Sequence, residues 1–161
     1  MKKTTNNTKK NTNYVNTAAL GRELNRHLAE RAKLQEQQDA LWVVIKRGND
    51  RSAQMDAITS KIGKNTYAVD KLIGQLARSG VRSGQVCTMA IGYLKSEIAR
   101  NQRIVSHWEK TIRKVESGKS SLVRSTGVEH HDTSNVRKYV AQKKRKIAEA
   151  QRYLSTLSRC A

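Results

Sequence analysis

The heptad pattern that decides the fold runs through residues 87–115, CTMAIGYLKSEIARNQRIVSHWEKTIRKV. Apolar residues recur in this stretch at alternating intervals of four and three, and one asparagine takes a place in the series. The series is Cys87, Ile91, Leu94, Ile98, Asn101, Val105, Trp108, Ile112 and Val115. Because a helix turns once in about 3.6 residues, this spacing gathers the side chains into a narrow seam that needs a partner helix. The stretch therefore predicts a long coiled-coil-like helix that ends at Gly118.

Three other segments show apolar seams. The segment before residues 87–115 has the series Met55, Ile58, Ile62, Asn65, Val69, Leu72 and Leu76. The last segment has Val136, Val140, Lys143, Ile147, Ala150, Leu154 and Leu157. The first segment, from about Thr17 to Arg47, has a weaker seam of Leu20, Leu24, Leu34, Leu41 and Ile45. It ends in ALWVVI (residues 40–45), which is apolar all round, and we expect this end to be its best-buried part.

Asn65 and Asn101 each interrupt an otherwise apolar seam near its middle. A buried asparagine at such a position costs stability but fixes the register or the oligomeric state of packed helices. The alternative is that each asparagine lies at a frayed or partly wet site, and the sequence favours neither.

Composition supports an all-α fold. The chain of 161 residues has no proline and only 4% aromatic residues, so long helices packed through aliphatic seams are favoured. We predict an antiparallel coiled-coil hairpin or small helical bundle, plus a basic C-terminal helix. The expected parts are a disordered basic tail (1–16), a three-helix coiled-coil or bundle region (17–118), a loop (119–133) and a basic amphipathic helix (134–161). A homo-oligomer would also complete the seams.

The charge balance indicates a polyanionic partner. Lysine and arginine number 32 against 13 acidic residues, a net charge of +19. No apolar run is long enough to span a membrane, and no apolar stretch follows the N-terminal lysines as in a signal peptide. Cys87 and Cys160 fit no disulfide framework, which favours a reducing, cytoplasmic location. Association with a nucleoid or another nucleoprotein would fit the same charge balance.

The basic residues of the last segment form a face. Lys138, Arg145, Arg152 and Arg159 recur every seven residues on the side opposite the seam. This basic row is flanked by Arg137 and Lys144 on one side and by Lys146 on the other. Lys143 alone falls on the seam, where its aliphatic stem could pack. These seven residues outside the seam are the predicted nucleic-acid-binding residues. A helix face with charges of one sign lacks the stabilising ion pairs between opposite charges that an ordinary solvated face has, which suggests an anionic partner.

The sequence thus predicts a non-enzymatic protein that binds nucleic acid mainly through phosphates, with duplexes favoured and DNA ahead of RNA. The alternative is a coiled-coil adaptor or inhibitor whose basic face docks on an acidic protein or a larger assembly. The tetrapeptide Lys143–Lys146 as a localisation signal has little support, because such signals usually lie in flexible segments. A partner membrane is not expected, since the apolar side of the segment lacks bulky anchors.

No motif indicates catalysis. The SGKSS stretch (117–121) lacks the first glycine of a phosphate-binding loop, since Arg113 stands there, and it follows a predicted helix. Glu129, His130, His131 and Asp132 are consecutive, and adjacent histidines rarely bind one ion. We therefore expect no catalytic residues, no metal and no cofactor.

Overall fold

The computed structural model describes residues 16–46, 51–81, 84–123 and 128–158. It contains four helices, α1 (Thr17–Lys46), α2 (Ser52–Arg78), α3 (Gln85–Glu116) and α4 (Ser134–Ser158). The prediction of an all-α fold is confirmed, because these helices pack against one another and the strands are only two residues long. None of the helices in the described ranges is long and apolar enough to cross a membrane. The predicted tail, apart from Asn16, lies outside the described residues.

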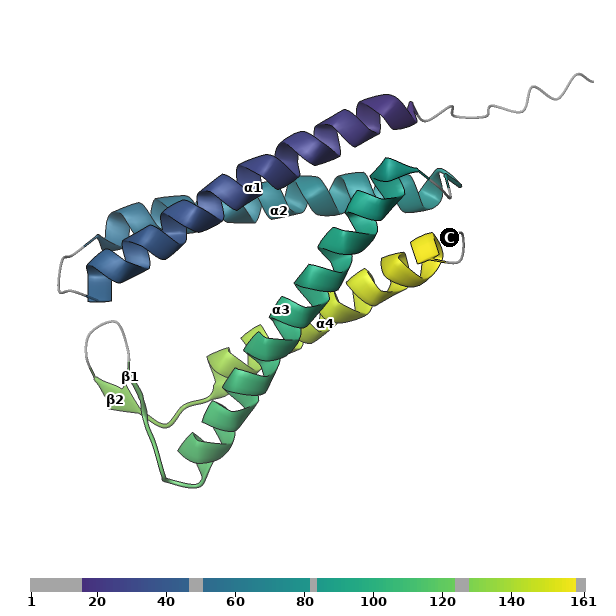
Figure 1. Cartoon of the computed structure of the whole chain (residues 1–161). Helices are drawn as coiled ribbons and strands as arrows, with labels where there is room; N and C mark the ends of the chain where they lie inside the picture. Colours follow the sequence, from purple (N-terminus) through teal and green to yellow (C-terminus); the bar gives the residue numbers. More distant parts are fainter. Residues whose placement is uncertain (1–15, 47–50, 82–83, 124–127, 159–161) are drawn as a thin grey trace, which may run out of the picture.

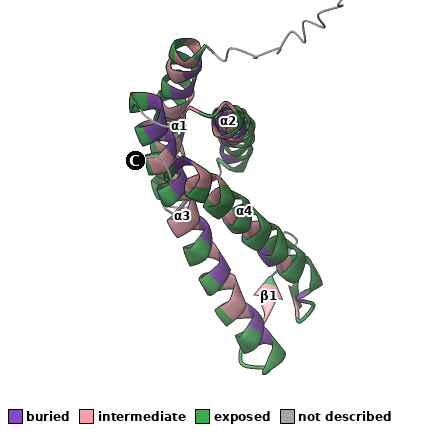
Figure 2. Cartoon of the chain, turned by 90° about the vertical axis from the view of Figure 1, so that its right-hand side faces the viewer, coloured by how far each residue is buried: buried purple, intermediate pink, exposed green. Residues whose placement is uncertain are grey.

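The helices form two antiparallel hairpins, α1 with α2 and α3 with α4, which meet at one end and diverge at the other (Figure 1). The basic C-terminal helix α4 packs along α3 and is therefore an integral part of the bundle. Figure 2 shows the exposed side of α4 facing away from this contact, and α2 lying apart from the far end of the α3–α4 hairpin.

The main hydrophobic core lies where the two hairpins meet. All four helices contribute, and the buried residues include Leu20, Leu24, Val69, Leu72, Ile73, Leu76, Val86, Cys87, Ala90, Tyr93, Leu94 and Leu157. Cys87, the first residue of the α3 seam, is buried here among apolar side chains. A second, smaller cluster of Val105, Ile112 and Val140 holds α3 and α4 together beyond the junction.

The predicted seams of α2, α3 and α4 lie on the packed faces. In α2, for example, six of the seven seam residues are buried and Ile58 is half-buried. Both seam asparagines are buried, Asn65 with 5% and Asn101 with 4% of its surface exposed, so neither lies at a frayed or exposed site. Asn65 Nδ2 donates to the carbonyl oxygen of His27 and to Glu30 Oε2, each at 3.1 Å. Asn65 therefore fixes the position of α1 relative to α2.

The prediction that ALWVVI is the best-buried part of the first helix is wrong. Trp42 is 48% exposed and Val43 is 51% exposed, whereas Leu24, near the other end of α1, is only 1% exposed. The physical reason is that the α3–α4 hairpin packs on the N-terminal half of α1. The far end of α1 has α2 as its neighbour, and one neighbour cannot cover a helix that is apolar all round.

The predicted loop contains a short β-ladder. Strands β1 (Leu122–Val123) and β2 (Glu129–His130) pair antiparallel, with Leu122 opposite His130 and Val123 opposite Glu129. The α4 helix starts directly afterwards, where the backbone N–H of Ser134 donates to Asp132 Oδ1 at 2.9 Å. The segment that was predicted to be a loop therefore contains a pair of two-residue strands, at the end of the α3–α4 hairpin that is far from the junction.

Candidate nucleic-acid interface

The outward face of α4 carries the predicted basic row. Lys138, Arg145 and Arg152 are all exposed, and their side chains form no ion pair with any residue that the structure describes. They face away from α3 because Val140, Ile147 and Leu154 on the opposite side pack against the bundle. The fourth member of the row, Arg159, lies outside the described residues. Three like charges are thus displayed to solvent along one helix face.

Two of the predicted binding residues are engaged within the hairpin. Arg137 Nη2 lies 2.5 Å from Glu116 Oε1, and Lys144 Nζ lies 2.7 Å from Glu109 Oε1. These hydrogen bonds lower the pKa of both glutamates below the usual range. The partners are seven residues apart on each helix, in opposite order, as an antiparallel pairing requires. The two ion pairs therefore help to set the register of α3 against α4, and they partly neutralise that side of α4.

Lys146 lies on the other side of α4, where it faces α2. It lines a groove between the two helices together with Asp70, Lys71 and Arg78 of α2 and Tyr153 of α4. Lys143 is half-buried on the seam, as predicted, with its Nζ 5.1 Å from the centre of the Tyr139 ring. Burial lowers the pKa of Lys143, and the nearby charge of Lys146 lowers it further.

Sequence reasoning missed a second basic row, on α2. Lys64, Lys71 and Arg78 also recur every seven residues, and all three are exposed. The signal that could have found them is the same as for α4, but the acidic residues Asp56 and Asp70 reduce the total charge of α2. Tyr67, between the first two lysines on the helix surface, is 74% exposed. The groove that Lys146 lines thus has a basic row on the α2 side as well.

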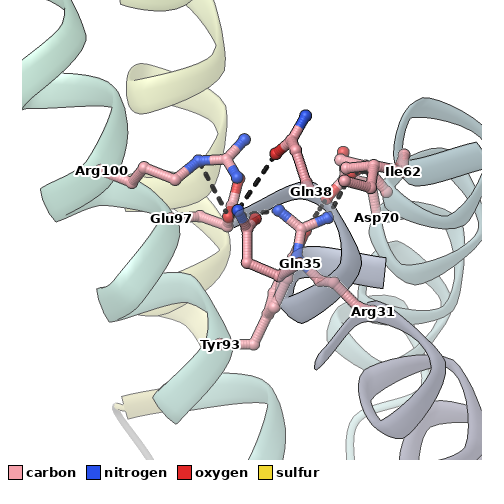
Figure 3. A network of polar contacts seen from close by, with 9 residues as sticks. Arg31, Gln35, Gln38, Ile62, Asp70, Tyr93, Glu97 and Arg100 are labelled. Atoms are coloured by element: carbon pink, nitrogen blue, oxygen red, sulfur yellow. Dashed lines mark hydrogen bonds and ion pairs between the residues drawn. The ribbon is translucent and has the colours of Figure 1, made fainter. Parts of the chain in front are cut away.

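A polar network fixes the two hairpins against each other. Arg31 of α1 donates from Nη2 to Glu97 Oε1 of α3 at 2.7 Å, and both side chains are nearly buried, at 11% and 14% exposure. Figure 3 shows Arg31 and Arg100 pointing toward Glu97 from opposite sides. Arg31 also donates to the Thr66 hydroxyl of α2 and lies over the Tyr93 ring, 5.5 Å from its centre. One guanidinium of α1 therefore contacts both α2 and α3.

Asp70 of α2 sits between this network and the groove. The Tyr93 hydroxyl donates to Asp70 Oδ1 at 3.4 Å. Burial raises the pKa of Asp70, and Lys146 opposes this effect, while Glu97 and Glu149 add to it. Burial also raises the pKa of Tyr93, and the Asp70 charge contributes. The folded structure therefore disfavours the ionised form of Asp70 relative to the unfolded chain.

Replacing Asp70 with asparagine is expected to raise the Tm near pH 7. The raised pKa means that ionised Asp70 destabilises the folded state relative to the unfolded chain. This penalty is complete above the folded pKa, shrinks as the pH falls through it, and vanishes below the unfolded value near 3.8. The Tm difference between Asp70→Asn and the parent should therefore disappear on acidification. A lower Tm for the variant at neutral pH would show that the Lys146 attraction outweighs burial.

Comparison with protein-family models, curated proteins and solved structures found no match to this chain. Its class is therefore defined by its own fold and surface. Among the described residues, it is an all-α protein of two packed helical hairpins, with basic rows exposed on α2 and α4.

Proposed function

We propose that this protein binds nucleic acid, with duplex DNA ahead of RNA, through phosphate contacts of the outer face of α4 and without catalysis. The observation that carries the proposal is the exposed row of Lys138, Arg145 and Arg152, which has no acidic partner among the described residues. The row extends about 20 Å at about 1.5 Å per residue, and Arg159 would lengthen it toward one turn of B-DNA.

Physical reasoning favours a nucleic acid over a membrane. A helix that lies on a bilayer needs a free apolar face opposite its charges. The apolar face of α4 is already occupied, because Val140 and Leu157 are buried against the rest of the bundle. The exposed positive charges of α4 are complementary to the phosphates of a nucleic acid, which can bind without an apolar contact.

The chemistry of the row favours binding that depends little on base sequence. Lysine and arginine side chains on one helix face reach phosphates readily, whereas base readout needs side chains fitted into a groove. Among the described residues, α4 offers Tyr139 and Tyr153 as its aromatic side chains, too few for a stacking platform along a single strand. We assign the activity to the cytoplasm, on a nucleoid or a similar nucleoprotein.

The test is the salt dependence of binding to labelled duplex DNA, duplex RNA and single-stranded DNA. With about six phosphate contacts, log K should fall with log salt at a slope near −5, or roughly a thousandfold between about 50 and about 200 mM. Duplex DNA should bind most tightly. Absence of duplex binding at the lowest salt would overturn the proposal.

A second candidate function is an adaptor that docks on an acidic protein. The observation that favours it is the exposed apolar end of α1, where Trp42 and Val43 are each about half exposed. Aromatic residues in exposed apolar patches are typical of protein contacts. This function predicts a stoichiometric protein complex that is weakened by Trp42→Ala, together with only feeble nucleic-acid binding that grows with duplex length.

A further inference from the structure

The outward face of α2 presents a basic row that the proposed function does not use. Lys64, Lys71 and Arg78 are exposed, and their side chains form no ion pair with any described residue. Arg78 lies in the last turn of α2, where a positive charge also stabilises the helix end. Lys64 and Lys71 lie in the middle of the helix and have no such structural reason.

The α2 row and the α4 surface share one groove. Lys71 and Arg78 line it from α2, and Lys146 and Tyr153 line it from α4. Gly74 permits this close approach, because a β-carbon there would lie 3.3 Å from Tyr153 Oη and 3.4 Å from Arg78 Nη1. The groove therefore runs from the side of the α4 row to the α2 row without a bulky side chain at Gly74.

We infer that α2 supplies a second phosphate-binding row, so that a nucleic acid bound to α4 continues across this groove onto Lys64, Lys71 and Arg78. This inference rests on the proposed function and deepens it, since it makes the interface a surface of two helices. The positive charge of the α2 row is complementary to the phosphate backbone. The exposed ring of Tyr67, beside Lys64 and Lys71, is positioned to contact sugar or base of the same strand.

Two acidic residues line this groove, the half-buried Asp70 of α2 and the exposed Glu149 of α4. Glu149 of α4 lines the groove, and its Oε1 accepts a hydrogen bond from Tyr153 Oη at 3.3 Å. A carboxylate there repels a phosphate backbone that crosses the groove. Glu149→Gln keeps the shape and the hydrogen-bond acceptor but removes the charge, so it should tighten duplex binding several-fold. A gain of affinity is a sharp readout, because partial misfolding would produce a loss.

The complementary variant is Lys64→Gln/Lys71→Gln in the full chain. Loss of two phosphate contacts should make the log–log salt slope shallower by about 2 and weaken duplex binding by roughly fiftyfold at about 100 mM salt. The matched control is Arg22→Gln/Lys33→Gln, which removes two exposed charges from α1, a helix that contributes no residue to the groove. Circular dichroism should show that both double variants keep their helices.

The outcomes separate this inference from the proposed function. A loss with Lys64→Gln/Lys71→Gln and a gain with Glu149→Gln, with the α1 control close to the parent, support the two-helix surface. If the α2 variant matches the α1 control while charge reversal on α4 abolishes binding, the inference is wrong and the proposed function stands. If the parent protein does not bind any duplex, both are wrong.

Discussion

Charge reversal at Arg145 and Arg152 is expected to weaken duplex DNA binding by more than about a hundredfold at about 100 mM salt. Each lost phosphate contact removes about 0.9 from the log–log salt slope, and the new carboxylates add repulsion. Both side chains are exposed on α4 and lack ion-pair partners among the described residues, so Arg145→Glu/Arg152→Glu should leave the fold intact. The measurement is a salt series of binding curves for parent and variant.

The matched control for this variant lies on α3. Arg103 and Lys110 are also exposed and seven residues apart, on the side of α3 opposite its seam. Arg103→Glu/Lys110→Glu changes the net charge by the same amount, so it reports the effect of total charge alone. Equal losses in the two variants would mean that binding follows net charge and that the α4 face has no special role.

The packed faces were predictable because a heptad seam states directly which side of a helix is buried. Met55, Val69 and Leu76 in α2 are buried as the spacing requires, and so are Leu94 and Val105 in α3. Periodicity does not state which end of a seam has more than one neighbour. The exposure of Trp42 and Val43 follows from where the second hairpin docks, and that position depends on contacts far apart in the sequence.

The candidate site was only partly predictable for a similar reason. The outward direction of Lys138, Arg145 and Arg152 follows from the α4 seam alone. The engagement of Arg137 and Lys144 requires knowing that α3 is the antiparallel partner, which brings Glu116 and Glu109 opposite them. The basic row of α2 could have been found from the sequence alone. Its proximity to α4 could not, because the groove between the two helices arises from their packing at the junction.

Besides the apolar core, the nearly buried pair of Arg31 and Glu97 joins the two hairpins that carry the basic rows. Arg31 belongs to the α1–α2 hairpin and Glu97 to the α3–α4 hairpin, so their 2.7 Å hydrogen bond spans the junction. A nearly buried charge that loses its partner carries a large desolvation penalty. The pair should therefore matter both for stability and for the geometry of the two-helix surface.

Replacing Glu97 with alanine is expected to destabilise the fold by about 3 kcal/mol, or roughly 10 °C in Tm, because it leaves Arg31 buried without its carboxylate. The measurement is thermal unfolding followed by circular dichroism. Glu97→Gln keeps an acceptor for Arg31 and should lose less, and Arg31→Met/Glu97→Ala should recover part of the loss by removing the stranded charge. If the double variant is as unstable as the sum of its single variants, the two side chains are not coupled. In that case the apolar core around Leu24 and Leu76, rather than this pair, sets the relation between the hairpins.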